Sequence, residues 1–114
     1  MNPQAEINAL KRKIEALEAK NEGLEIKNEE FEAESRDLRS RLTEIDSPEG
    51  KDKDDIRDRI RENQSKIIAN KETIRANTER ITALDTRITE YQRTINATIT
   101  ASGKTTFENN IISS

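Results

Sequence analysis

The sequence has no cysteine, histidine or tryptophan, and its only aromatic residues are Phe31, Tyr91 and Phe107. The missing cysteine excludes a disulfide framework and thiol chemistry. Three aromatic rings in 114 residues, with a hydrophobic content of 31%, are too few for a globular core. Two possibilities remain: a disordered chain, or an elongated fold whose apolar residues form one narrow seam.

Other absences narrow the function. The net charge is −3 with both signs interspersed, so no basic stripe indicates a nucleic-acid partner. No apolar run approaches the roughly 20 residues that span a bilayer, and the N-terminus lacks the basic and apolar regions of a signal peptide. No nucleophile with a base, metal-ligand set or phosphate loop stands out. We therefore expect a protein that is not an enzyme and uses no cofactor.

Periodicity decides against disorder. A heptad seam with alternating steps of three and four residues begins at Ile7 and continues without a break for nearly six heptads. Asn2 and Pro3 have the residue types of an N-cap and a first helical position, so the first coiled-coil segment is predicted over residues 3–46. Its seam consists of Ile7, Leu10, Ile14, Leu17, Asn21, Leu24, Asn28, Phe31, Ser35, Leu38, Leu42 and Ile45.

A second segment is predicted over residues 53–98, where isoleucine recurs every seven residues. Its seam consists of Ile60, Asn63, Ile67, Asn70, Ile74, Asn77, Ile81, Leu84, Ile88, Tyr91 and Ile95. Pro48 and Gly50 predict an interruption at residues 47–50, within a linker over residues 47–52. Around Thr98 the apolar residues Ile95, Ala97 and Ile99 alternate with polar residues, which is the period of an extended strand. The chain is therefore predicted to continue as an extended or docking tail over residues 99–114.

Two arrangements fit this all-α coiled coil, and two tests disagree. In a parallel oligomer each g residue faces the e residue five positions later on its neighbour, and every such pair in the first segment is attractive. The pairs are Glu6–Lys11, Lys13–Glu18, Lys20–Glu25, Lys27–Glu32, Glu34–Arg39 and Arg41–Asp46. In an antiparallel hairpin, by contrast, g faces g, and Lys13, Lys20 and Arg41 would approach Arg87, Arg80 and Arg59.

The polar seam residues favour the hairpin. If the chain bends near Glu49, so that facing residue numbers add to 98, Asn21 meets Asn77, Asn28 meets Asn70, and Ser35 meets Asn63. An unpartnered buried Asn costs about 1–3 kcal/mol, so matched polar layers are stabilising. A parallel homo-oligomer also matches every Asn with its own copies. We therefore favour the parallel form and keep the hairpin as the alternative.

The second segment resembles the trimeric coiled-coil stalks of phage fibres, neck whiskers and tail needles, and of bacterial trimeric adhesins. The residues that carry the resemblance are Ile74-Arg75-Ala76-Asn77-Thr78, Ile67-Ile68-Ala69-Asn70, Arg80-Ile81-Thr82-Ala83-Leu84-Asp85 and Arg41-Leu42-Thr43-Glu44-Ile45-Asp46. The resemblance implies a homotrimer in which Asn63, Asn70 and Asn77 hold an axial anion such as chloride. The simpler interpretation of these residues, and of Asn21 and Asn28, is that they fix the register of the coiled coil.

The favoured hypothesis is therefore a parallel homotrimeric stalk or spacer of a phage virion, attached at one or both ends to a larger assembly. The alternative is an intracellular, cytoplasmic helical-hairpin adaptor or scaffold.

Overall fold

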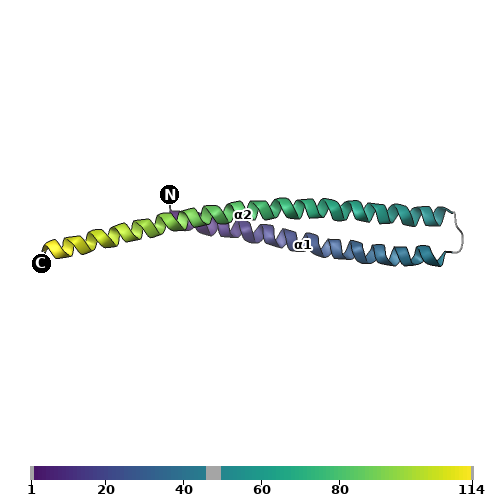
Figure 1. Cartoon of the computed structure of the whole chain (residues 1–114), viewed down its shortest axis with the longest axis horizontal. Coiled ribbons are helices and arrows are strands. Elements are labelled where there is room, and N and C mark those ends of the chain that lie inside the picture. Colours follow the sequence, from purple (N-terminus) through teal and green to yellow (C-terminus); the bar gives the residue numbers. More distant parts are fainter. Residues whose placement is uncertain (1, 46–49, 114) are drawn as a thin grey trace. The chain divides into compact units, whose positions relative to one another are not determined.

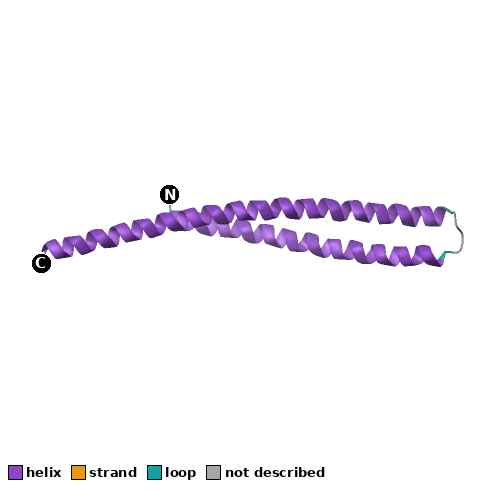
Figure 2. Ribbon diagram, viewed as in Figure 1, coloured by secondary structure: helices purple, strands orange, loops and turns teal. Residues whose placement is uncertain are grey.

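The computed structural model consists of two long helices. It describes residues 2–45 and 50–113, and the side chains as far as residue 100. Helix α1 spans Pro3–Glu44 and helix α2 spans Lys51–Ser113. Figure 2 shows only helix and short connecting loops in the described residues, with no strand among them. The prediction of an all-α fold is confirmed for the described residues.

The start of each helix follows from its local chemistry. The side-chain Oδ1 of Asn2 accepts a hydrogen bond from the Gln4 amide at 3.0 Å, as expected of an N-cap ahead of Pro3. Helix α2 begins after Gly50, whose carbonyl accepts from the Asp54 amide at 3.2 Å. Asp52 and Asp54 lie in the first turn, where negative charge favours the helix dipole.

The predicted boundaries at the interruption need small corrections. Helix α1 ends at Glu44 and helix α2 starts at Lys51, each two residues from the predicted limit. The predicted break includes Ser47 and Pro48, which lie outside the described residues.

The tail predicted over residues 99–114 as extended or docking is helical as far as Ser113. Its extended form is therefore wrong, and its docking stays a prediction. A three-residue alternation is too short to overcome helix propagation from a long segment already formed. Threonine hydroxyls are also satisfied within the helix. Thr94 Oγ1 donates to the Glu90 carbonyl at 3.1 Å, and Thr98 Oγ1 donates to the Thr94 carbonyl at 2.9 Å. Ser114 lies outside the described residues.

The chain divides into two compact units, each containing part of both helices. Unit 1 comprises residues 1–16 and 79–114, and unit 2 comprises residues 17–78. Within unit 1 a cluster of apolar side chains joins the start of α1 to α2. It consists of buried Ile7, Leu10, Ile14 and Ile88 with partly buried Ile81, Leu84, Tyr91 and Ile95. Full burial of one such side chain contributes about 1.5–3 kcal/mol, so this cluster is the main stabilising feature of unit 1.

Unit 2 is a helical hairpin. Residues 17–44 of α1 and 51–78 of α2 lie side by side and run in opposite directions (Figure 1). Its buried side chains are Asn28, Ser35, Leu38, Ile60, Asn63, Ile67 and Asn77, all of them positions on the predicted seams. Unit 2 therefore has the antiparallel arrangement given above as the alternative, and its two helices do not follow one another in line. The predicted homotrimer stays a prediction.

The physical reason lies in the exposure of the like-charged residues. Lys13 and Arg87, which argued against the hairpin, both remain exposed in unit 1. Water screens charges at the surface, so their repulsion costs little. Matching of buried polar layers outweighs this repulsion.

Neither helix is long and apolar enough in its described part to cross a membrane.

Candidate functional site: the polar layers of unit 2

Three polar layers cross the seam between α1 and α2 in unit 2. They are spaced by one heptad on each helix, and each joins residues whose numbers add to 98: Asn21 with Asn77, Asn28 with Asn70, and Ser35 with Asn63. Every predicted polar seam residue is thus brought against another polar seam residue.

The two Asn–Asn layers are built in the same way. Asn77 Nδ2 donates to Asn21 Oδ1 at 3.0 Å, and Asn70 Nδ2 donates to Asn28 Oδ1 at 2.8 Å. The amide of the α1 residue then donates back to α2. Asn21 Nδ2 reaches Thr78 Oγ1 and Asn28 Nδ2 reaches the Ile67 carbonyl, each at 3.4 Å. Each layer is therefore bonded in both directions across the seam.

The third layer contains a charged pair at its edge. Asn63 Nδ2 donates to Ser35 Oγ at 3.3 Å and to Glu34 Oε1 at 3.2 Å. Arg59 Nε donates to the same Glu34 oxygen at 2.6 Å. Asn63 is fully buried, and its Oδ1 has no hydrogen-bond partner among the residues that the structure describes. This layer is the least completely satisfied of the three.

The charged pair alters the acidity of its members. The hydrogen bond from Arg59, and then the one from Asn63, lower the pKa of Glu34 below its ordinary value. The same bond to Glu34 raises the pKa of Arg59. On the outer side of α2, the hydrogen bond from Lys66 lowers the pKa of Glu62. These shifts come from surface ion pairs and not from a buried catalytic group.

The apolar residues predicted for the oligomer core all lie at buried or half-buried positions. They are, in unit 1, Ile7, Leu10, Ile14, Ile81, Leu84, Ile88 and Ile95, and in unit 2, Leu17, Leu24, Phe31, Leu38, Leu42, Ile45, Ile60, Ile67 and Ile74. Lys66 covers the exposed side of one of them, with its Nζ 5.4 Å from the centre of the Phe31 ring. In this chain the seam packs α1 against α2. Whether copies also associate is a separate question.

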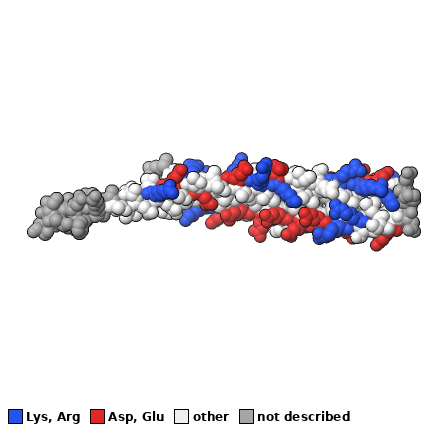
Figure 3. All heavy atoms as spheres, viewed as in Figure 1, with Lys and Arg blue, Asp and Glu red and all other residues white. Residues whose placement is uncertain are grey.

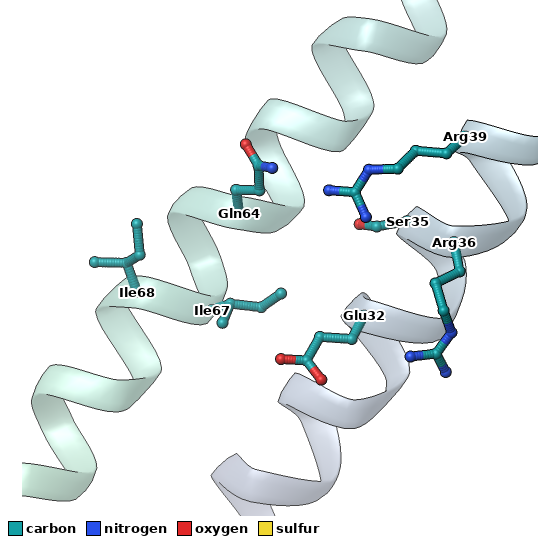
Figure 4. Close-up of a pocket in the computed structure, with 7 residues that line it drawn as sticks. All are labelled: Glu32, Ser35, Arg36, Arg39, Gln64, Ile67 and Ile68. Carbon is teal, nitrogen blue, oxygen red and sulfur yellow. The ribbon is translucent and has the colours of Figure 1, made fainter. Parts of the chain in front are cut away.

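A shallow groove lies beside the third polar layer and was missed by the sequence analysis. Glu32, Ser35, Arg36 and Arg39 of α1 and Gln64, Ile67 and Ile68 of α2 line it (Figure 4). Ile67 is buried at the seam, whereas Ile68 is 62% exposed. The signal in the sequence was the pair Ile67-Ile68, because only one of two successive helical residues can occupy a single seam.

The described residues contain no cluster of three or more His, Cys, Asp or Glu side chains able to hold a metal ion. Comparison with protein-family models, with curated proteins and with solved structures finds no match.

Proposed function

We propose that this chain is a non-enzymatic helical-hairpin adaptor or scaffold, in which α1 and α2 form a stiff double arm. The observation that supports it is the agreement of the three polar layers, Asn21–Asn77, Asn28–Asn70 and Ser35–Asn63, in one antiparallel register. Buried polar pairs of this kind select register and orientation at some cost in stability. They suit a protein whose task is to hold a defined length and direction.

The position of Glu34 adds a second argument. In a parallel oligomer Glu34 would pair with Arg39 of a neighbouring copy, whereas in unit 2 it binds Arg59 of its own chain at 2.6 Å. A charge that is already engaged within the hairpin contributes less to a parallel partner. The hairpin thus engages one member, Glu34, of one of the six pairs that favour the parallel arrangement.

A parallel trimeric stalk of a phage virion is the alternative. The attractive g–e pairs over residues 6–46 favour it, as does the resemblance of residues 60–100 to such stalks. Axial chloride at Asn63, Asn70 and Asn77 belongs to this alternative only. A virion location would follow from the stalk and a cytoplasmic one from the adaptor.

One distance measurement separates the two. Because the chain has no cysteine, Glu30→Cys with Ala69→Cys places two spin labels on exposed positions of unit 2 without background labelling. With helices about 10–12 Å across, the hairpin predicts a distance below about 30 Å. An in-line rod would separate the two sites by about 58 Å at 1.5 Å per residue.

The sample is diluted with unlabelled chain so that only distances within one copy are read. A short distance that persists on dilution supports the hairpin. A distance near the in-line value, or a short distance that disappears on dilution, would contradict it.

A further inference from the structure

The surface around the groove of unit 2 divides by charge into two halves. We name this surface the groove face and define it by the e and b positions of the two helices. Within residues 22–39 of α1 and 57–75 of α2, these positions are Glu22, Glu25, Glu29, Glu32, Arg36 and Arg39 from α1 and Arg57, Arg61, Gln64, Ile68, Lys71 and Arg75 from α2. In the space-filling view, acidic atoms gather along the middle of α1 and basic atoms lie nearer the connection between the helices (Figure 3).

The half nearer the connection carries four arginines, two from each helix. Arg57 and Arg61 are partly neutralised by Asp54 and Asp58 on their own helix, each at 3.6 Å. Arg36 and Arg39 form no ion pair with any described residue, and both lie beside the groove (Figure 4). The free positive charge of this half is therefore concentrated on α1.

The other half carries the four glutamates of α1 together with Lys71 and Arg75. Arg75 is engaged by Glu72 of its own helix at 2.9 Å. A second, smaller groove on this half is lined by Glu25, Asn28, Glu29, Glu32, Lys71 and Ile74. The glutamates outnumber the basic residues, so this half is acidic.

We propose that the groove face binds the groove face of a second copy of this chain, in an antiparallel dimer with a two-fold axis near residues 32 and 33 of α1. The argument is charge complementarity combined with the exposed Ile68. A two-fold axis at this level places Glu29 opposite Arg36 of the second copy and Glu25 opposite its Arg39. Symmetry repeats both pairs, and the basic half of each copy covers the acidic half of the other.

The same operation buries the apolar centre of the face. Ile68 of each copy comes level with Gln64 of the other, beside the groove formed by Ser35 and Ile67. This removes from water the most exposed large apolar side chain of unit 2. Lys71 and Arg75 approach Arg61 and Arg57 of the second copy, but three of these four charges are already paired with acids on their own helices. The dimer would give the proposed adaptor two arms pointing in opposite directions.

The test uses two oppositely charged variants of the full chain in sedimentation equilibrium. One carries Glu25→Arg with Glu29→Arg, and the other carries Arg36→Glu with Arg39→Glu. Each alone should dissociate at least about tenfold more readily than the unsubstituted chain, because like charges then face each other across the axis. Mixed in equal amounts, they should form a heterodimer of about the original affinity, since every facing pair becomes attractive again.

The unsubstituted dimer should also weaken as salt is raised from about 50 to 500 mM. Matched charge changes on the opposite face serve as controls. These are Lys20→Glu with Lys27→Glu, and Glu30→Arg with Glu44→Arg, all at exposed positions without ion pairs among the described residues. The controls should leave dimerisation unchanged. Equal weakening by the controls would overturn the proposal.

Circular dichroism of each variant checks that it is helical. If a charge variant unfolds, Ile68→Ser provides an independent test at a side chain that is 62% exposed. It should weaken the dimer about tenfold or more and leave the helical content of the monomer unchanged. A chain that is monomeric at millimolar concentration, or helical variants whose mixture does not associate, would overturn the proposal.

This inference rests on the proposed hairpin, and the two can fail separately. The spin-label pair at positions 30 and 69 lies away from the groove face. A short distance within one copy together with a monomeric mass would reject the dimer and keep the hairpin.

Discussion

Asn28 and Asn70 bind each other across the seam of unit 2, with Asn70 Nδ2 donating to Asn28 Oδ1 at 2.8 Å. Replacing Asn28 by Leu would leave the half-buried Asn70 amide without its acceptor. We expect the free energy of unfolding to fall by about 1–3 kcal/mol, measured by urea denaturation followed by circular dichroism.

The double replacement Asn28→Leu with Asn70→Leu should recover most of this loss, because two apolar side chains then meet in place of one unpaired amide. The recovery is a coupling energy that a double-mutant cycle measures directly. Losses that simply add would show that the two amides do not act as a pair.

The third polar layer should respond differently. Asn63 is fully buried and its Oδ1 has no partner among the described residues, so Asn63→Leu removes an unsatisfied atom together with two donated hydrogen bonds. The buried Ser35 hydroxyl then loses its donor. We expect a loss of about 1–2 kcal/mol, smaller than that for Asn28→Leu. A larger loss in the same urea experiment would mean that Asn63 Oδ1 is satisfied in solution, for example by a water molecule.

The pair formed by Glu34 and Arg59 predicts a pH dependence. The pKa of Glu34 is lowered in the folded chain, chiefly by the hydrogen bond from Arg59. A group with a lowered folded pKa stabilises the fold above its unfolded pKa. That contribution disappears as the pH falls through the folded pKa, so the loss begins below about pH 4.5.

Arg59→Ala should therefore raise the pKa of Glu34 towards its ordinary value and reduce this acid dependence. The measurement is a carbon-13 NMR titration of the Glu34 carboxyl group. Arg61→Ala is the matched control, because Arg61 pairs with Asp58 of its own helix and not with Glu34. An unchanged Glu34 pKa in Arg59→Ala would contradict the structure.

Gly23 offers a stabilising substitution. It lies inside α1, and a Cβ added there meets no atom within 4 Å. Gly23→Ala should raise the free energy of unfolding by about 0.5–1 kcal/mol, because alanine loses less conformational freedom in a helix. A destabilised variant in a thermal or urea transition would indicate that another surface packs closely against this position.

Much of this fold follows from sequence, because a heptad seam is both long and regular. The pairing of Asn21 with Asn77 was predicted for one of the two arrangements, together with its register. The choice between the arrangements was not. In the hairpin, the sequence predicts that Arg59 approaches Arg41. A g residue of an antiparallel pair, however, has two g neighbours across the seam. The other neighbour, Glu34, is the one that Arg59 binds.

Two further features were less accessible from sequence. The helix beyond Thr98 contradicts local composition, because helix propagation and threonine bonding to i−4 carbonyls act over a longer range than a three-residue pattern. The groove beside Ile68 depends on two helices meeting at a particular level, and a single helix pattern does not specify that level.

The equal spacing of the polar layers has a mechanical consequence. If α1 slid past α2 by one heptad, Asn28 would meet Asn77 and Ser35 would meet Asn70, so two of the three layers would remain polar. Only Asn21 and Asn63 would lose their partners, whereas a slide of three or four residues would break every layer. We therefore expect the hairpin of unit 2, pulled along its length, to extend in steps near 10 Å, which is seven residues of helix rise. Optical-trap records that show a single opening with no such step would contradict this. A hairpin with polar layers spaced in this way resists a slip of a few residues, but under load its helices shift past each other by whole heptads.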